Sequence, residues 1–205
     1  MMSRRFHYIL FGLLALIALC AAGFAGVMLS GARPPILSAY LTRAIGGPFT
    51  LVADSGRTVT DRTYRGKWLL VFFGYTHCPD VCPETLNTIA AALRQLGPKA
   101  AEVQPLFITV DPTRDTPHVM ANYVRAFDPR IVGLTGTPEQ IAAVAHAYKV
   151  YFSPDESAQE RDYQVDHSAF VYLIDPQGQF VQLFGGATSN DKIAARLRQL
   201  IRTPV

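Results

Sequence analysis

The order of apolar and polar residues along the chain predicts a central sheet covered by helices. The uninterrupted apolar run Trp68–Phe73 is typical of a strand buried on both faces. Two shorter apolar runs, Leu106–Val110 and Ile131–Leu134, predict further strands. Apolar residues at helical spacing predict helices over Pro83–Leu96, Pro117–Phe127, Pro138–Lys149 and Asp191–Ile201. Because helices and strands alternate, the predicted fold class is α/β, built on a largely buried sheet.

Two hairpins complete the predicted domain. The first joins Phe49–Val52 to Thr58–Thr60 through a short turn that contains glycine. The second joins a strand over Val165–Ile174 to one over Gln179–Phe184 through an Asp-Pro-Gln-Gly turn. Between helix and hairpin, Ser153–Gln164 forms a polar insertion.

The N-terminal segment differs in kind from this domain. Arg4 and Arg5 precede an uncharged, apolar stretch over Phe6–Ser30, and ~20 apolar residues span a bilayer. A cleaved signal peptide is the alternative, but its apolar core would be shorter, so the length favours a retained anchor. A lipoprotein signal would need a small residue before Cys20, where Leu19 stands. Basic residues ahead of the span predict a cytoplasmic N-terminus and a domain on the outer side.

These features divide the chain into three parts. Residues 1–33 form the cytoplasmic tip and the predicted anchor, residues 34–47 a Pro- and Gly-containing tether, and residues 48–205 the folded domain. Three of the 19 basic residues and none of the 16 acidic ones lie in the first part, so the rest of the chain is balanced. A balanced domain without a Lys/Arg cluster has no electrostatic footprint for nucleic acid.

Cysteine is rare in this sequence, yet two of the three cysteines lie close together. Cys78 and Cys82 follow the predicted buried strand, and Pro83 is a favourable first residue for the next helix. There the positive end of the helix would stabilise a thiolate on Cys82 and lower its pKa. A structural disulfide is the alternative, but closing so short a loop removes little entropy from the unfolded chain. The placement therefore favours an exposed, reactive pair.

The other residue with distinctive chemistry is His167, which opens the strand predicted at Val165–Ile174. In a parallel sheet, such strand ends lie near helix N-termini, where the cysteines are expected. Two thiolates and one imidazole form a soft site suited to copper, with zinc as the competitor. His77, beside Cys78, is either an additional ligand or a residue that shapes the loop.

Several motifs follow one another along the domain: Phe72–Pro83 (FFGYTHCPDVCP), Phe107–Pro117 (FITVDPTRDTP), Gly133–Gly136 (GLTG) and Asp166–Ser168 (DHS) ahead of Tyr172–Asp175 (YLID). In order and spacing they resemble the Sco/SenC family, membrane-tethered proteins involved in assembling cytochrome c oxidase. The resemblance covers about residues 46–203. It implies a thioredoxin-like fold with an N-terminal hairpin, preceded by one transmembrane helix.

The resemblance also implies that Cys78, Cys82 and His167 bind one copper ion, as Cu(I) or Cu(II). The implied function is delivery of this copper to the dinuclear centre of oxidase subunit II. The alternative is reduction of the subunit II cysteines before metallation, with Cys78 and Cys82 as the catalytic redox pair, so enzymatic activity stays open. A general reductase would carry Cys-x-x-Cys and a cis-proline, whereas this chain has one more residue between its cysteines and no proline beside His167.

The implied location is a bacterial inner membrane, crossed once, with the domain in the periplasm. Other periplasmic copper chaperones or thiol reductases are the further expected partners. One interpretation of the second motif is that Arg114 and Asp115 pair and fix the loop beside the site. The alternative for this stretch is a helix start, with Thr116 as the N-cap before Pro117. Asp166 either orients the neighbouring imidazole or is solvated.

Overall fold

The computed structural model describes residues 8, 13–17, 19, 45–154, 163–167 and 169–201, with the backbone alone at residues 154, 166 and 167. The chain divides into two compact units, Met1–Leu41 and Thr42–Val205. Within the described residues, no helix combines the length and apolarity needed to cross a bilayer. Most of the predicted anchor lies outside the described residues, as does Cys20. The anchor and the boundaries of the three predicted parts therefore remain predictions.

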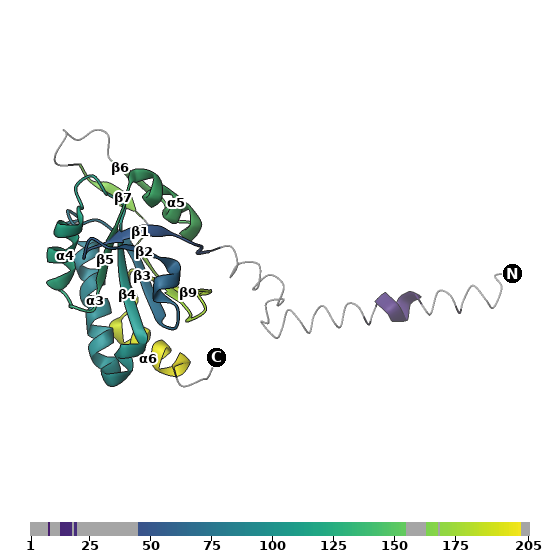
Figure 1. Cartoon of the computed structure of the whole chain (residues 1–205). Helices are drawn as coiled ribbons and strands as arrows, with labels where there is room; N and C mark the ends of the chain where they lie inside the picture. The colour runs from purple at the N-terminus through teal and green to yellow at the C-terminus, as the bar shows by residue number, and fades with distance from the viewer. Residues whose placement is uncertain are drawn as a thin grey trace. The chain divides into compact units, whose positions relative to one another are not determined.

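The second unit contains a mixed sheet with helices on both faces (Figure 1). The strands are β1 (Thr50–Ala53), β2 (Thr58–Thr60), β3 (Trp68–Gly74), β4 (Val103–Thr109), β5 (Val132–Thr135), β6 (Phe152–Pro154), β7 (Val165–His167), β8 (Phe170–Ile174) and β9 (Phe180–Gly185). The helices of this unit are α3 (Val81–Leu96), α4 (Pro117–Arg125), α5 (Pro138–Tyr148) and α6 (Asn190–Leu200), with 3-10 turns at η1 (Asp61–Tyr64) and η2 (Gly97–Glu102). The large sheet has the order β2-β1-β5-β4-β3-β8-β9, and β6 pairs with β7 in a smaller sheet. The predicted α/β class and both predicted hairpins are confirmed.

The central strand β3 is buried along its whole length, as its apolar sequence predicts. Its side chains alternate between two cores. Leu70 and Phe72 pack in the core formed with α3, α4 and α6. Leu69, Val71 and Phe73 pack in the core formed with α5. An all-apolar strand is therefore required here, because both faces of the sheet are covered.

Parallel pairing gives the sheet two distinct edges. β3 and β4 run parallel and end opposite each other at Gly74 and Thr109. β5 runs parallel to β4, with Val132 at its start opposite Leu106. The loops that follow β3 and β4 therefore meet at one edge, called here the carboxyl edge. The loops that precede β3, β4 and β5 lie at the other, the amino edge.

One predicted strand is divided in two by the structure. The sequence predicts a single strand over Val165–Ile174, but β7 pairs with β6, whereas β8 pairs with β3 and β9. β6 itself lies at the start of the stretch predicted to be a polar insertion. The chain thus changes sheets after His167, and this residue ends β7 rather than opening a long strand. A continuous β-type pattern cannot reveal such a change, because both pieces are extended.

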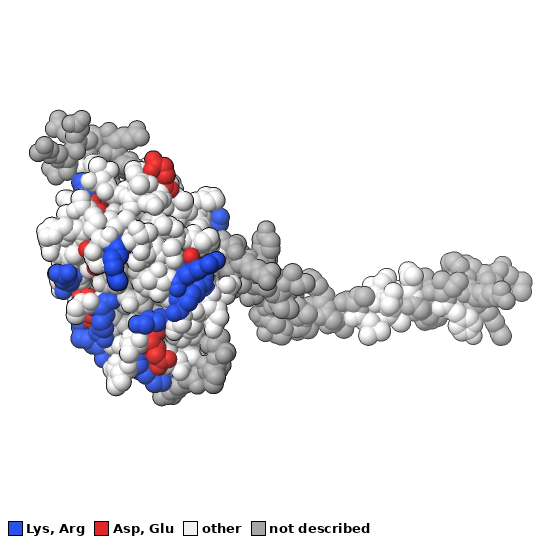
Figure 2. Space-filling view, viewed as in Figure 1, with Lys and Arg blue, Asp and Glu red and all other residues white. Residues whose placement is uncertain are grey.

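The charged residues of the surface are dispersed. On the face seen in Figure 2, Lys and Arg lie in several separate groups, and some of these have Asp or Glu beside them. Wide uncharged areas separate the groups on this face. This distribution agrees with the balanced composition of the chain beyond its N-terminal part.

Candidate metal and thiol site

Cys78 and Cys82 lie at the carboxyl edge, in the turn that leads from β3 into α3. The helix begins at Val81, two residues before the predicted Pro83, so Cys82 lies in its first turn. The backbone N–H of Cys82 donates to the Sγ atom of Cys78 at 3.4 Å. No disulfide joins these two residues in the structure. The fold therefore brings the two predicted sulfur ligands together.

The two cysteines differ in access to solvent. Cys78 is half-buried, whereas Cys82 is 0% exposed. The pKa of the Cys82 thiol is raised, first by its hydrogen bond with Cys78 and second by burial. The predicted lowering of this pKa by the helix dipole is wrong, because the hydrogen bond with Cys78 and desolvation outweigh the dipole. The predicted exposure of both thiols is likewise wrong for Cys82.

Gly74, the last residue of β3, makes room for the buried sulfur. A Cβ atom at this position would lie 2.5 Å from the Sγ atom of Cys82 and 2.8 Å from a ring carbon of Phe107. Both distances are shorter than van der Waals contact, so any larger residue would displace the sulfur or the ring. The absence of a side chain at Gly74 thus leaves the space that the Cys82 sulfur occupies.

A buried carboxylate supports the loop before the cysteines. Asp115 is 0% exposed. It accepts hydrogen bonds from the Thr76 N–H at 3.0 Å, the Thr76 hydroxyl at 2.5 Å and the Thr109 hydroxyl at 2.6 Å. Burial raises the pKa of Asp115, and these hydrogen bonds act against the rise. Asp115 therefore ties the start of the cysteine loop to the end of β4.

Arg114 pairs with Asp111, so the predicted pair between Arg114 and Asp115 is wrong. Asp111 also accepts a hydrogen bond from the Tyr163 hydroxyl at 2.6 Å. Arg114 donates to the Tyr163 carbonyl at 3.0 Å, and its guanidinium lies 3.7 Å from the centre of the Tyr163 ring. The alternative prediction for this stretch, Thr116 as the N-cap of α4, is confirmed. Arg114 and Asp111 together hold the segment that enters β7.

A second tie joins β7 directly to the cysteine loop. The Tyr75 hydroxyl donates to the Oε1 atom of Gln164 at 2.8 Å and accepts from the Val165 N–H at 3.3 Å. Tyr75 directly follows β3 and shortly precedes Cys78, while Val165 begins the strand that ends at His167. The backbone of the predicted histidine strand is thereby bonded to the chain that carries the predicted sulfur ligands.

Of the two histidines predicted as ligands or loop residues, the structure describes the side chain of His77 but only the backbone of His167. His167 ends β7, where its backbone pairs with Phe152, but its side chain lies outside the described part of the structure. Among the side chains that are described, no three His, Cys, Asp or Glu residues gather as a metal site. This search leaves out the imidazole of His167, so the three-ligand set remains a prediction. His77 is exposed, and its Nδ1 atom lies 3.2 Å from the Thr76 hydroxyl.

Sequence reasoning missed three side chains that shape this edge: Tyr75, Asp111 and Tyr163. The bonds between Asp111 and Tyr163 and between Tyr75 and Val165 join positions 52 and 90 residues apart, and no local pattern links such positions. Only the position of Tyr75 in the sequence indicated a role at this edge, because Tyr75 stands between a buried strand and the cysteine loop. Asp111 lies within the motif Phe107–Pro117, but nothing in this motif indicates that Tyr163 is its partner.

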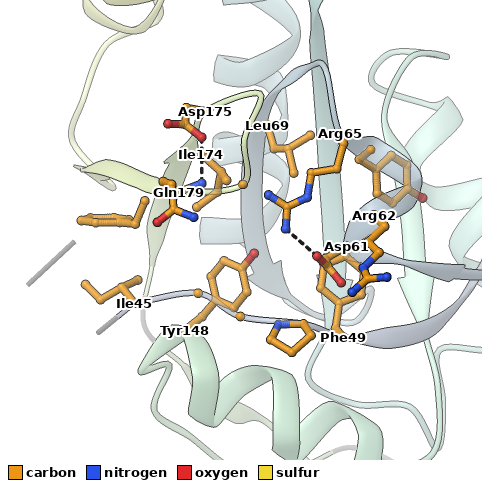
Figure 3. Close-up of a pocket in the computed structure, with 16 residues that line it drawn as sticks. Ile45, Phe49, Asp61, Arg62, Arg65, Leu69, Tyr148, Ile174, Asp175 and Gln179 are labelled. Carbon is orange, nitrogen blue, oxygen red and sulfur yellow. Dashed lines mark hydrogen bonds and ion pairs between the residues drawn. The ribbon is translucent and has the colours of Figure 1, made fainter. Parts of the chain in front are cut away.

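A cavity lies away from the cysteines, beside Leu69 and Ile174 near the start of β3 (Figure 3). Its volume is about 370 Å³. Asp61 and Arg65 form an ion pair of 2.7 Å in its wall, and the Tyr148 hydroxyl points into it. The described residues that line it include no cysteine or histidine. Thiol and soft-metal chemistry therefore belongs to the carboxyl edge and not to this cavity.

An α/β domain with a pair of cysteines at the junction of a buried strand and the following helix is a protein of the thioredoxin-like class. Comparison with known families agrees with this assignment, since the SCO1/SenC family model matches residues 38–202. The chain belongs to the SCO1/SenC family. The family and the thioredoxin-like fold implied by the sequence motifs are thus confirmed.

Relatives come from bacteria and from mitochondria. The structure of Bradyrhizobium japonicum ScoI with copper bound is 47% identical, with a TM-score of 0.71, and the match covers 76% of this chain and 99% of that one. The structure of yeast Sco1 with copper bound is 38% identical, with a TM-score of 0.73, over 79% of this chain and 91% of that one. Human protein SCO1 homolog, mitochondrial, is 45% identical over 77% of this chain. The match spans 53% of the human protein's length.

Proposed function

We propose that this chain is an assembly factor for cytochrome c oxidase that binds one copper ion and delivers it to the dinuclear copper centre of subunit II. The observation that carries the proposal is the contact between Cys78 and Cys82 beside the strand that ends at His167. The copper bound by the Bradyrhizobium japonicum and yeast relatives supports it.

The donor set suits copper as the cargo. Two cysteine sulfurs and the His167 imidazole are soft ligands of the kind that copper prefers, and zinc is the competing ion. Thiolates bind metal and thiols do not, so binding must displace the proton of Cys82 despite its raised pKa. Because Cys78 is the more accessible sulfur, we assign it the first contact with an incoming ligand or partner.

The proposed location is a bacterial inner membrane, with the domain in the periplasm. The uncharged stretch Phe6–Ser30 after Arg4 and Arg5 supports a retained anchor, and the bacterial ScoI relative supports a bacterial setting. Proposed partners are subunit II and other periplasmic copper chaperones or thiol reductases. Retention in membranes through carbonate extraction, with digestion of the domain from the outer side only, is the expected result. A soluble mature form that begins near Gly26 would contradict the anchor.

A second candidate function is thiol–disulfide exchange with the cysteines of subunit II. The observation that favours it is the unequal access of the two thiols, with Cys78 half-buried and Cys82 fully buried. Exchange needs one accessible sulfur to form the mixed disulfide and a second to resolve it. The same pair of residues can therefore serve either function.

Metal loading tests the proposal directly. The full-length chain in detergent is reduced, loaded with Cu(I), and then challenged with zinc, and bound metal is measured per chain. We expect one copper ion that zinc does not displace, and none in the Cys78→Ser or Cys82→Ser variant. Cys20→Ser is the matched control, because it removes a cysteine from the N-terminal segment and should bind copper normally. Zinc retained in preference to copper would contradict the proposal.

A further inference from the structure

Tyr75 hydrogen-bonds to both parts of the chain that carry the predicted copper ligands. Its backbone carbonyl accepts from the Cys78 N–H at 3.3 Å. Its hydroxyl donates to the Oε1 atom of Gln164 at 2.8 Å and accepts from the Val165 N–H at 3.3 Å. One residue therefore links the cysteine loop to the start of β7, the strand that ends at His167.

Packing alone does not require the hydroxyl of Tyr75. The residue is 2% exposed and lies in the core that also contains Val165. A phenylalanine would fill the same space and would avoid the cost of burying a polar group. The hydroxyl of Tyr75 is instead paired both as donor and as acceptor, and both partners belong to the segment that leads to His167. These bonds indicate a role in fixing β7.

Side-chain bonds matter here because β7 has little support from a sheet. It is three residues long and, in the described structure, pairs with β6 in a two-stranded sheet apart from the large one. A two-stranded sheet is only marginally stable by itself. A separate set of bonds holds Tyr163, whereas Tyr75 holds the two residues that follow. From Val165 to His167 an extended strand covers only about 7 Å, so the bonds made by Tyr75 lie close to the predicted ligand.

We propose that Tyr75 is a positioning residue for His167: its hydroxyl holds the start of β7 so that the imidazole reaches the copper ion bound by Cys78 and Cys82. The inference rests on the proposed function, in which His167 is the third ligand. Tyr75 itself does not bind the metal. It restricts β7 before copper arrives, so less conformational freedom is lost on binding and the affinity is higher.

The two sulfurs do not depend on this hydroxyl. The Cys78 N–H bonds to the backbone carbonyl of Tyr75, which any residue at this position would supply, and the Cys82 N–H bonds to the Cys78 sulfur. Removing the hydroxyl should therefore weaken the contribution of His167 to copper binding and leave that of the cysteines unchanged.

Tyr75→Phe tests the inference, because it removes the hydroxyl and keeps the ring. In the full-length chain in detergent, competition with a Cu(I) chelator should show a copper affinity about tenfold lower, as expected when a metal ligand loses its supporting partner. Tyr172→Phe is the matched control. Tyr172 is also 2% exposed in the same core, and its hydroxyl makes no bond to β7 in the described structure. The control should bind copper like the wild type. No change in Tyr75→Phe, or an equal loss in both variants, would overturn the inference.

The same substitution in a His167→Ala background separates positioning from a general loss of stability. If Tyr75 acts through His167, Tyr75→Phe should not lower copper affinity further once the imidazole is absent. A further loss of about tenfold in this background would mean that Tyr75 acts on the sulfurs or on the whole fold, and would overturn the inference.

Amide hydrogen exchange of the metal-free protein tests the hold on β7 without copper. The Val165 N–H should exchange about tenfold faster in Tyr75→Phe because its acceptor is gone, whereas the Cys82 N–H should exchange as in the wild type. Equal exchange of the Val165 N–H in the two proteins would show that the hydroxyl does not hold β7, and the inference would fail.

The His167→Ala variant distinguishes failure of the inference from failure of the proposed function. Unchanged copper affinity in this variant would reject the ligand role of His167, and the inference with it. A lower affinity in His167→Ala together with an unchanged affinity in Tyr75→Phe would reject the inference alone.

Discussion

The two edges of the sheet both contain pairs of aspartate and arginine, but they use them differently. At the amino edge, Arg65 and Asp61 have side-chain exposures of 40% and 15%. At the carboxyl edge, Arg114 and Asp111 have exposures of 14% and 4%. An exposed ion pair contributes little to stability. Removing one partner of a buried pair costs more, because it leaves an unpaired charge in the protein interior. Of the three buried carboxylates among the described residues, Asp111 and Asp115 lie at the carboxyl edge and Asp128 at the amino edge, so only the carboxyl edge has a pair in which the arginine is also largely buried.

The sequence separation between bonded residues also differs between the two edges. At the amino edge, Asp128 bonds to Arg130, and Asp61 bonds to Arg65 within the same turn. At the carboxyl edge, Asp111 bonds to Tyr163, 52 positions away in the sequence. The two Asp–Arg pairs of the amino edge are therefore local. The carboxyl edge is assembled from distant segments, as expected of a site that must hold ligands from two parts of the chain.

The largest expected effect comes from oxidising the cysteine pair. Joining Cys78 and Cys82 in a disulfide removes both thiolates, so copper binding should be abolished and should return on reduction. The amino edge contains no part of this chemistry, so its ion pairs should be unaffected. Metal analysis of the oxidised and re-reduced protein checks this, with thiol counting as the control. Equal copper affinity in both states would exclude the paired-thiolate site.

His167→Ala should produce the next largest change. Loss of an outer ligand partner lowers metal affinity by ~10 to 100-fold, and loss of a direct ligand should exceed this. Copper affinity is therefore expected to fall by more than about 100-fold, while the cysteine pair still cycles between thiol and disulfide. Competition with a Cu(I) chelator measures the affinity. His118→Ala, on the exposed side of α4, is the matched control.

Oxidase activity in cells with His167→Ala then separates the two candidate functions. Loss of activity favours copper delivery, because thiol exchange needs no imidazole. Near-normal activity favours reduction of the subunit II cysteines. Copper affinity equal to that of the wild type would instead remove His167 from the ligand set and direct attention to His77.

The third prediction compares the two ion pairs directly. Arg114→Leu leaves Asp111 buried without its cation and removes the bond to the Tyr163 carbonyl. We expect a loss of about 2 kcal/mol in the free energy of unfolding, below the ~3–5 of a fully buried pair because Arg114 keeps some exposure. Arg65→Leu, the matched change at the amino edge, should cost about 0.5 kcal/mol. Urea unfolding of both variants measures these values, and equal losses would refute the contrast between the edges.

The same contrast explains what the sequence could predict. β3, the hairpins and the N-cap at Thr116 depend on local spacing and turn residues, and all were predictable. The proximity of Cys78 and Cys82 was predictable for the same reason, because one turn contains both.

The errors arose where distant segments meet. The division of Val165–Ile174 between two sheets depends on pairing with β6, which the local pattern does not contain. Arg114 was predicted to pair with its sequence neighbour Asp115, but the buried carboxylate of Asp115 accepts hydrogen bonds from Thr76 and Thr109 instead. The predicted direction of the Cys82 pKa shift was wrong because the hydrogen bond with Cys78 and the burial of the sulfur, which packs beside Gly74, outweigh the helix position. Helix position is local, whereas desolvation is a property of the whole core.

The smallest expected effect concerns how folding stability depends on pH. The contributions of one carboxylate at each edge should change with pH in opposite directions. Arg130 lowers the pKa of Asp128 at the amino edge, whereas burial raises the pKa of Asp115 at the carboxyl edge. Asp128 therefore contributes stability that is present above its unfolded pKa of about 3.9 and is lost as pH falls through the folded value. Asp115 contributes stability that is present below that unfolded value and is lost as pH rises through its higher folded pKa.

Urea unfolding between about pH 3 and pH 7 tests this with Asp128→Asn and Asp115→Asn. The advantage of the wild type over Asp128→Asn should grow with pH, by at most about 1 kcal/mol because Arg130 is well exposed. The advantage over Asp115→Asn should shrink over the same range, because only the wild type must charge a buried carboxyl group. An asparagine oxygen at the Oδ2 position accepts from the Thr76 N–H and the Thr109 hydroxyl, and its amide group at the Oδ1 position donates to the Thr76 hydroxyl, so the fold around the cysteine loop should survive. Parallel pH profiles for the two variants would mean that the two carboxylates share one environment, and the distinction between the edges would lose its electrostatic basis.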